Sequence, residues 1–155
     1  MDSLEVGEHD GDVVVRTLSD RDLGRLVKMD QAWVGRNRSR YLEDKLKRAL
    51  GAGVQVSLGA EIDGTLVGAL LGAVQYGEFG RAEPVAVLDT ILVDPDFTGR
   101  GLVGALMQQL EKNLAALRIE RLRTEVAWTE TRLMSYLAHE GFVPVPRLVL
   151  EKTIG

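Results

Sequence analysis

The stretch VDPDFTGRGLVGALM, residues 93–107, is the most informative part of the chain, because an apolar strand leads through a glycine-rich turn directly into a helix. Gly99, Gly101 and Gly104 carry no Cβ, so the turn can adopt left-handed backbone angles and let a ligand approach its amides closely. The helix begins with unpaired N–H groups and with the positive end of its dipole, which together attract an anion. Arg100 adds a cation to the same turn. The stretch therefore predicts a phosphate-binding loop.

The glycine spacing leaves two kinds of phosphate ligand open. Gly99, Gly101 and Gly104 match the G-x-G-x-x-G pattern of dinucleotide-binding folds, in which the first glycine directly follows a strand of a βαβ unit. Here Asp94 to Thr98 separate the strand from the first glycine, and two or three successive strands precede it. The dinucleotide alternative therefore lacks its usual context.

The run V-D-P-D-F-T-G-R-G-L-V-G-A-L resembles motif A of the GNAT family of N-acetyltransferases, in which a strand ending V-x-P is followed by R/Q-x-x-G-x-G/A and a helix. The resemblance implies that backbone amides of this loop bind the pyrophosphate of acetyl-coenzyme A. Thr98 stands where the family has Arg or Gln, and Val103 where it has Gly or Ala, but recognition through backbone amides tolerates both changes. The implied coenzyme-binding residues are Ile91, Leu92, Val93, Thr98, Gly99, Arg100, Gly101, Leu102, Val103, Gly104, Ala105 and, farther along the chain, Glu130.

Composition bounds the class of protein. The chain has 155 residues, of which 45% are hydrophobic and 27% charged, as in an ordinary globular domain. It has no Cys, which excludes disulfides, thiolate zinc sites and cysteine nucleophiles, and its two histidines, His9 and His139, lie too far apart to suggest a metal site. The longest largely apolar run, residues 65–74, is too short to span a membrane.

The N-terminus differs in charge from the rest of the chain. We expect residues 1–12 to form a flexible acidic tail and residues 13–155 to form one domain. The formal net charge of -4 is due largely to the acids of this tail, Asp2, Glu5, Glu8, Asp10 and Asp12. An acidic start is the reverse of a signal peptide. We therefore expect a soluble, cytoplasmic protein that binds neither nucleic acid nor membranes.

Hydrophobic periodicity predicts the elements. We expect a hairpin pairing residues 55–62 with 65–75 around Asp63-Gly64, a connection over residues 77–84, and a central strand over residues 85–93. A strand at residues 13–18, a helix capped by Ser19 and a helix at residues 39–50 precede them. A helix at 101–117, a strand at 121–127, a helix at 130–139 and closing strands at 142–144 and 148–152 follow. The order β-α-α-β-β-β-α-β-α-β-β resembles the GNAT order, which implies a single α/β (α+β) domain with a mixed, mainly antiparallel twisted sheet flanked by helices.

Asp89 is the candidate general base. By the resemblance, the strand before the loop carries a bulge and splays from its neighbour, so that amides near Ile91 and Val93 bind the pantetheine arm and polarise the thioester carbonyl. Asp89 is the only acid inside this apolar strand, near the place where several family members carry a catalytic Glu. An amine with a pKa of about 10 must lose a proton before it attacks, and burial would make a carboxylate a better base. Two alternatives stay open: a water could act as the base, or Asp89 could be a buried structural residue.

Tyr136 is the candidate general acid. Family members often show N-x-x-A-x-x-x-Y-x-x-x-G-F, and the run E-T-R-L-M-S-Y-L-A-H-E-G-F ends in the matching Gly141-Phe142. Leu137 occupies the Tyr position, Tyr136 lies about 100° around the helix, and Glu130 occupies the Asn position. Tyr136 would serve only if the helix were rotated or bulged, and core packing is the alternative. A thiol with a pKa of about 8.5 can leave without protonation, so transfer does not require this acid. His139 fits a dipole-stabilising position at the helix end better than a catalytic one.

The sequence says least about which residues bind the acceptor. Residues 36–48 hold six Lys and Arg residues, which either attract an acidic acceptor or form a solvated helix face, and Trp33 and Tyr41 either line an acceptor pocket or pack. The resemblance implies an acetyl-coenzyme A-dependent N-acetyltransferase that acts on a primary amine, in a small molecule or a peptide, by direct attack in a ternary complex. The alternative is an acyl-coenzyme A-binding sensor or scaffold without turnover. A homodimer is compatible with the sequence.

Overall fold

The computed structural model describes residues 12–155, so the predicted acidic tail lies almost entirely outside the described residues. The chain divides into two compact units, Met1–Glu125 and Val126–Gly155. The first unit contains the sheet, and the second contains the last helix.

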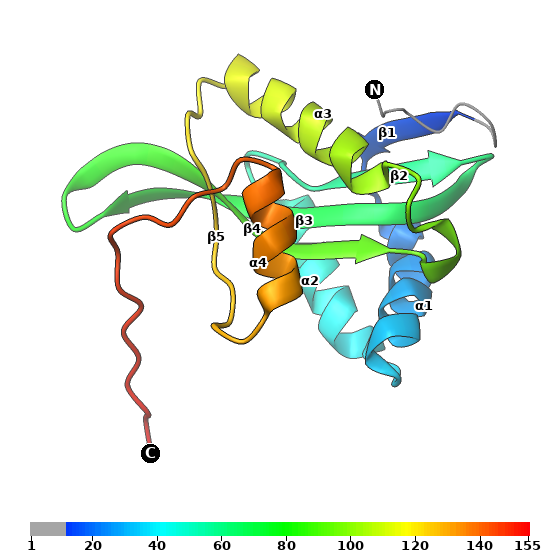
Figure 1. Cartoon of the computed structure of the whole chain (residues 1–155), viewed down its shortest axis with the longest axis horizontal. Coiled ribbons are helices and arrows are strands. Elements are labelled where there is room, and N and C mark those ends of the chain that lie inside the picture. Colours follow the sequence, from blue (N-terminus) through cyan, green and yellow to red (C-terminus); the bar gives the residue numbers. More distant parts are fainter. Residues whose placement is uncertain (1–11) are drawn as a thin grey trace. The chain divides into compact units, whose positions relative to one another are not determined.

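A mixed sheet forms the centre of the first unit, and within residues 12–125 it has five strands in the order β1-β2-β3-β4-β5 (Figure 1). The strands are β1 (Val13–Thr17), β2 (Leu58–Ile62), β3 (Thr65–Glu78), β4 (Arg81–Val93) and β5 (Leu122–Thr124). The first three pairings are antiparallel, and β5 pairs with β4 in parallel. A parallel pair needs a crossover, which α3 (Leu102–Ala116) supplies. The predicted mixed, mainly antiparallel sheet is confirmed.

Two tight turns connect the antiparallel strands. Asp63 and Gly64 have φ values of 51° and 80°, the left-handed pair of a type I′ turn, so the predicted hairpin is confirmed. Phe79 and Gly80 have φ values of 45° and 87° and form a second such turn between Glu78 and Arg81. The predicted connection over residues 77–84 is therefore wrong. Because Gly80 accepts a positive φ without steric cost, a two-residue turn is enough and both strands continue up to it.

Helices cover both faces of the sheet (Figure 1). A short 3-10 turn, η1 (Asp20–Asp22), leads from Ser19 into α1 (Leu23–Val34), which is followed by α2 (Ser39–Gly51). On this face a buried cluster joins both helices to the sheet; it consists of Leu18, Leu26, Met29, Leu46, Ala49, Leu66, Ala69, Leu71 and Leu92. On the other face lies α3, where a Cβ on Gly68 would come 3.5 Å from the Leu106 side chain. The apolar stripe of α3 is buried at Leu102, Leu106, Met107, Leu110 and Leu114 but ends before Leu117, which is 50% exposed.

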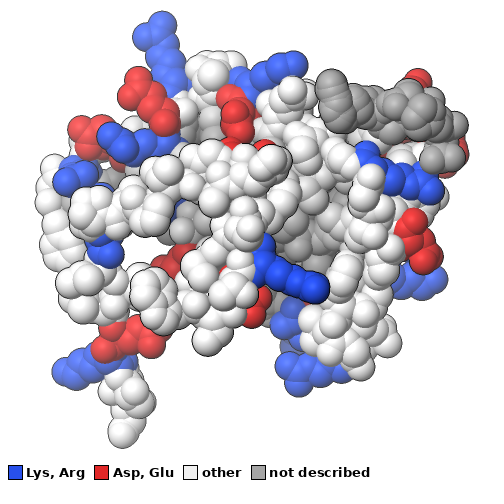
Figure 2. All heavy atoms as spheres, in the orientation of Figure 1, with Lys and Arg blue, Asp and Glu red and all other residues white. Residues whose placement is uncertain are grey.

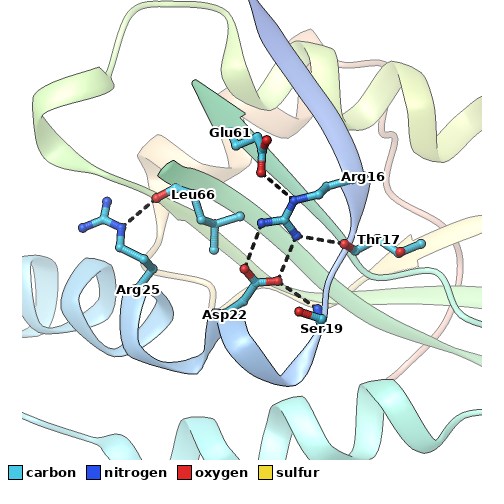
Figure 3. Close-up of polar contacts among 7 residues, drawn as sticks. All are labelled: Arg16, Thr17, Ser19, Asp22, Arg25, Glu61 and Leu66. Carbon is cyan, nitrogen blue, oxygen red and sulfur yellow. Dashed lines mark hydrogen bonds and ion pairs between the residues drawn. The ribbon is translucent and has the colours of Figure 1, made fainter. Parts of the chain in front are cut away.

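An ion-pair network ties the start of α1 to the sheet (Figure 3). The Arg16 guanidinium contacts both oxygens of Asp22 at 2.9 Å, and its Nε donates to Glu61 Oε2 at 2.7 Å. The backbone N–H of Ser19 donates to Asp22 Oδ2 at 2.8 Å. Burial alone would raise the pKa of Asp22, but the hydrogen bonds from Arg16 and Ser19 outweigh burial and lower it. The carboxylate form of Asp22 therefore stabilises the junction between β1 and α1.

We expect Asp22→Asn to lower the free energy of unfolding by about 2 kcal/mol at pH 7, because Asp22 is buried and its loss removes the two-oxygen ion pair with Arg16, which keeps only Glu61 as an acidic partner among the described residues. The pKa of Asp22 is lower in the folded state, so its contribution is present above the unfolded pKa of about 3.9 and is lost as the pH falls through the folded pKa. Urea titrations at pH 7 and pH 3 measure both effects. Asp20→Asn, in the same turn but exposed, is the control. An unchanged midpoint at pH 7 for Asp22→Asn would contradict this account.

The second unit differs most from the prediction. It contains α4 (Thr131–His139), whereas residues 142–155 form no strand, so the two predicted closing strands are wrong. Pro144 and Pro146 have no backbone N–H to donate to a ladder. Val143, Leu148 and Leu150 are 74%, 86% and 85% exposed, so their apolar side chains lack the burial that stabilises a strand.

In the first unit, the strand predicted at residues 121–127 is shorter than expected and covers only Leu122–Thr124.

The described surface carries both signs of charge. On the face drawn in Figure 2, Lys and Arg side chains are interspersed with Asp and Glu side chains. Among the described residues, none of the helices has the length and apolar character needed to cross a membrane.

Candidate active site

Strand β4 carries a bulge at Asp89. Leu71 pairs with Thr90 and Gly72 pairs with Leu88, so Asp89 has no partner on β3. Gly72 makes this irregularity possible, because a Cβ there would collide with the backbone carbonyl of Val87. The Ser57 hydroxyl accepts from the Gly72 N–H at 3.1 Å and donates to its carbonyl at 3.3 Å, which holds Gly72 in place. The bulge that the resemblance implied is present in the structure.

Directly after the bulge, β4 loses its second neighbour. Strand β5 pairs only with Ala86, Val87 and Leu88, and the Thr124 hydroxyl donates to the Leu88 carbonyl at 2.7 Å at its end. Within residues 12–125, no other strand takes its place beside the rest of β4. Within residues 12–125, this edge of β4 therefore has no neighbouring strand from Asp89 onwards, and we call it the open side of β4.

The backbone alternation of β4 decides which groups face this opening. The Asp94 N–H donates to the Val67 carbonyl on β3 at 2.8 Å. Because polar groups alternate along a strand, Ile91 and Val93 direct their N–H and C=O groups away from β3. The Val93 carbonyl agrees with this direction, since it accepts from the Trp33 indole at 2.6 Å. The N–H groups of Ile91 and Val93 thus face the open side, and Trp33 holds the strand end.

The predicted phosphate loop connects β4 to α3 through a short 3-10 turn, η2 (Pro95–Phe97). Gly99 and Gly101 have φ values of 79° and 71°, so both use the left-handed conformation that favours glycine. The first bond of α3 runs from the Ala105 N–H to the Gly101 carbonyl at 3.0 Å. The N–H groups of Leu102, Val103 and Gly104 therefore have no acceptor within the helix.

No side chain of the described residues caps this helix start. Gly101 occupies the N-cap position and has no side chain to cap the helix. A Cβ on Gly104 would meet no atom within 4 Å, so the space beside this amide is open. Thr98 turns its hydroxyl to the Pro95 carbonyl at 3.3 Å, and the Arg100 guanidinium lies 5.0 Å from the centre of the Phe97 ring. Val103 is half-buried. The arrangement fits an anion bound by successive backbone amides.

Arg25, which sequence analysis missed, holds the start of this loop. Its Nε donates to the Leu66 carbonyl at 2.8 Å (Figure 3), and its Nη2 lies 2.6 Å from Asp94 Oδ2. Asp94 also accepts from the Asp96 N–H at 2.9 Å. Burial alone would raise the pKa of Asp94, but the hydrogen bonds from Arg25 and from the Asp96 N–H lower it, so the carboxylate persists. The carboxylate links α1 to the loop, and Arg25 adds the link to β3. An Arg on an amphipathic helix carries no sequence signal for this role.

Asp89 is partly exposed and paired with a lysine, not buried as predicted. Its side chain is 49% exposed, so the prediction of a buried carboxylate is wrong; the bulge turns this residue out of the apolar alternation. Lys45 Nζ lies 2.9 Å from Asp89 Oδ1, and the Thr90 hydroxyl donates to the same oxygen at 2.6 Å. Lys45 on α2 is a second residue that the sequence did not identify. The structure thus places Asp89, the amides of Ile91 and Val93, and the predicted phosphate loop on one strand and the connection that follows it.

The basic stretch at residues 36–48 agrees mostly with the solvated helix face, one of the two expectations for it. Arg38 Cζ and Lys45 Nζ lie 4.6 Å and 5.5 Å from the centre of the Tyr41 ring, and Arg38 pairs with buried Asp30 at 2.6 Å and 2.9 Å. The neighbouring basic residues Arg36, Arg40, Lys47 and Arg48 are exposed. Most of this stretch is thus a solvated face, and two of its cations are committed to carboxylates.

The remaining predicted residues lie in the second unit. Helix α4 runs without a bulge, Glu130 precedes its first turn and His139 lies in its last. Leu137 is buried. The Tyr136 hydroxyl is buried without a hydrogen-bond partner among the described residues, and burial and the nearby Glu140 carboxylate raise its pKa. Tyr136 therefore keeps its proton at neutral pH, and its role as an acid stays a prediction.

Known proteins share this architecture. The acetyltransferase (GNAT) family model matches residues 25–142. An acetyltransferase from Yersinia pestis strain Pestoides F is 34% identical over 84 residues, which are 54% of this chain and 55% of that protein, so the chain spans about half the length of the curated relatives that it matches.

Two solved structures show the same fold. The aminoglycoside antibiotic 6'-N-acetyltransferase AAC(6')-Ih from Acinetobacter baumannii has a TM-score of 0.76 at 19% identity, with 92% of this chain and 99% of that chain covered. AAC(6')-Iy in complex with the bisubstrate analog CoA-S-monomethyl-acetylneamine has a TM-score of 0.75 at 19% identity, with 94% and 100% covered. With the bulge, the open strand and the glycine loop in place, and with the family model matching most of its length, the chain belongs to the acetyltransferase (GNAT) family.

Proposed function

We propose that this protein transfers an acetyl group from acetyl-coenzyme A to a primary amine by direct attack in a ternary complex. The observation that carries the proposal is the order of features along one strand: a bulge at Asp89, outward N–H groups at Ile91 and Val93, and then a glycine loop at a helix start. A linear ligand with a thioester at one end and a pyrophosphate farther along matches that order.

The residues present fit such a ligand. The N–H groups of Leu102, Val103 and Gly104 would hold the pyrophosphate, because the glycine at the N-cap position leaves them without a side-chain cap and the helix dipole adds positive potential. Thr98, Gly99, Arg100 and Ala105 complete the proposed loop contacts, and Leu92 and Glu130 remain in the proposed binding set. Acetyl-coenzyme A would supply the activated acetyl thioester.

The strand would promote the chemical step. A preorganised N–H donor aimed at a developing oxyanion is worth about 3 kcal/mol, and the N–H groups of Ile91 and Val93 are the donors placed for this task. The acceptor nitrogen bonds to the acetyl carbon, the carbon–sulfur bond breaks, and its electron pair leaves on sulfur. Asp89, or a water that Asp89 binds, takes the proton from the nitrogen. Tyr136 is the proposed donor to the sulfur.

We expect Asp89→Asn to lower kcat about 100-fold while coenzyme affinity stays within about twofold, because a general base contributes roughly 10²–10⁴ in rate. Thiol release from acetyl-coenzyme A across a panel of amines measures kcat, and calorimetry measures affinity. Glu83→Gln, an exposed acid on the same strand, is the matched control and should behave as wild type. Equal turnover by Asp89→Asn and wild type would remove Asp89 from the mechanism and leave water as the base.

A second candidate is an acyl-coenzyme A-binding sensor or scaffold that does not turn its ligand over. Leu137, buried at the position where the family resemblance implies a Tyr acid, favours this candidate. Tight coenzyme binding without thiol release above background, for every amine in the panel, would support the sensor over the enzyme.

A further inference from the structure

Lys45 on α2 reaches the bulge at Asp89, and it belongs to a row of side chains on that helix, Tyr41, Lys45 and Arg48, that we call the basic stripe. Lys45 pairs with Asp89 at 2.9 Å, and Lys45 lies one helical turn after Tyr41 and one before Arg48. Arg38 lies against the same Tyr41 ring but is neutralised by Asp30. Asp44 borders this stripe, whereas Glu43 lies about 160° around the helix from Lys45. The cation that pairs with Asp89 among the described residues thus belongs to the protein itself.

We propose, on the basis of the proposed function, that the acceptor is an amine that carries its own carboxylate, and that Lys45 is the residue that selects it. Before an acceptor binds, Lys45 Nζ occupies the position beside Asp89 where an acceptor ammonium would bind. An incoming ammonium that pairs with Asp89 must displace Lys45, which is only 21% exposed and then needs another anion. A carboxylate on the acceptor supplies that anion, so the two ion pairs exchange partners.

The same geometry disfavours acceptors with several positive charges. A second ammonium on the acceptor would meet the Lys45 ammonium at the position where a carboxylate is favoured, and like charges at short range repel. The preference is electrostatic and partly solvent-exposed, so it should weaken as salt screens the charges. Lys45 acts here as a positioning residue that determines specificity, and the proton transfer stays with Asp89 or its water.

Three amines of one chain length test this inference: 5-aminopentanoate, pentylamine and 1,5-diaminopentane, whose far ends are anionic, neutral and cationic. We expect kcat/KM to be about tenfold higher for 5-aminopentanoate than for pentylamine at low salt, and lowest for the diamine. Shorter and longer matched triples extend the test to acceptors of other sizes. In Lys45→Gln the preference for 5-aminopentanoate should disappear and kcat/KM for the diamine should rise. Lys45→Arg should retain the preference.

Lys47→Gln is the matched control, because it removes the same charge from the same helix about 160° around from Lys45, at an exposed position. It should leave the order of the three amines unchanged. Equal kcat/KM values across each triple, or the diamine ranked first by the wild type, would overturn the inference while leaving the acetyltransferase proposal intact. If coenzyme binds and no amine in any triple is acetylated, the proposed function fails and the inference fails with it.

Discussion

Gly101→Val is expected to weaken coenzyme affinity about 100-fold, which corresponds to about 2.7 kcal/mol. Gly101 has a φ of 71°, and a β-branched residue in this conformation is strained by roughly 1–2 kcal/mol or more. The strain shifts the start of α3, and the new side chain lies beside the N–H groups that we propose bind the pyrophosphate. Each hydrogen bond to a charged group contributes about 1.5–3 kcal/mol, so misplacing one or two of them accounts for the loss. Calorimetric titration of coenzyme A measures the affinity.

Gly64→Val is the matched control for this prediction. Gly64 also has a positive φ, 80°, but lies in the β2–β3 turn, so the same side chain introduces similar backbone strain away from the loop. It should lower the free energy of unfolding without changing coenzyme affinity. If both variants lost affinity equally, the effect would be a general loss of stability, and the loop would not be the binding site.

Gly72→Ala should lower the free energy of unfolding by about 2–3 kcal/mol and reduce turnover at least tenfold. The added methyl group would collide with the Val87 backbone carbonyl, and a backbone atom cannot rotate away as a side chain can. Relief requires β4 to shift, which alters the bulge and the direction of the Ile91 and Val93 amides. Urea denaturation and thiol release measure the two effects.

Gly24→Ala is the comparison for Gly72→Ala, because a Cβ at Gly24 meets no atom within 4 Å and the residue lies inside α1. This change should stabilise the protein by about 0.5–1 kcal/mol through helix propensity, with turnover unchanged. If Gly72→Ala had the same stability and turnover as the wild type, the bulge at Asp89 would not depend on this glycine.

Features with a strong local signal could be predicted from the sequence. Asp63-Gly64 predicts its hairpin because both residues accept a positive φ, and the regular apolar spacing of α3 predicts its buried stripe. The glycine loop between β4 and α3 was predicted for the same reason, since its backbone angles exclude most other residues.

Features that depend on contacts across the fold could not be predicted. The bulge at Asp89 depends on Gly72 and Ser57, which lie on other segments, so the exposure of Asp89 has no signal in its own strand. Arg25 and Lys45 belong to amphipathic helices, where a basic residue usually faces solvent, and their partners Asp94 and Asp89 are far away in sequence. Short apolar runs suggest the two closing strands at residues 142–144 and 148–152, but such runs cannot show whether a partner strand is present.

The most direct test of the central claim follows the backbone amides by nuclear magnetic resonance while coenzyme A is added to isotopically labelled protein. The account predicts that the N–H signals of Leu102, Val103 and Gly104 move as coenzyme A binds, and that pantetheine, which lacks the pyrophosphate, leaves these three signals in place. Binding of coenzyme A that left these amides unmoved, or a complete absence of binding, would contradict the account.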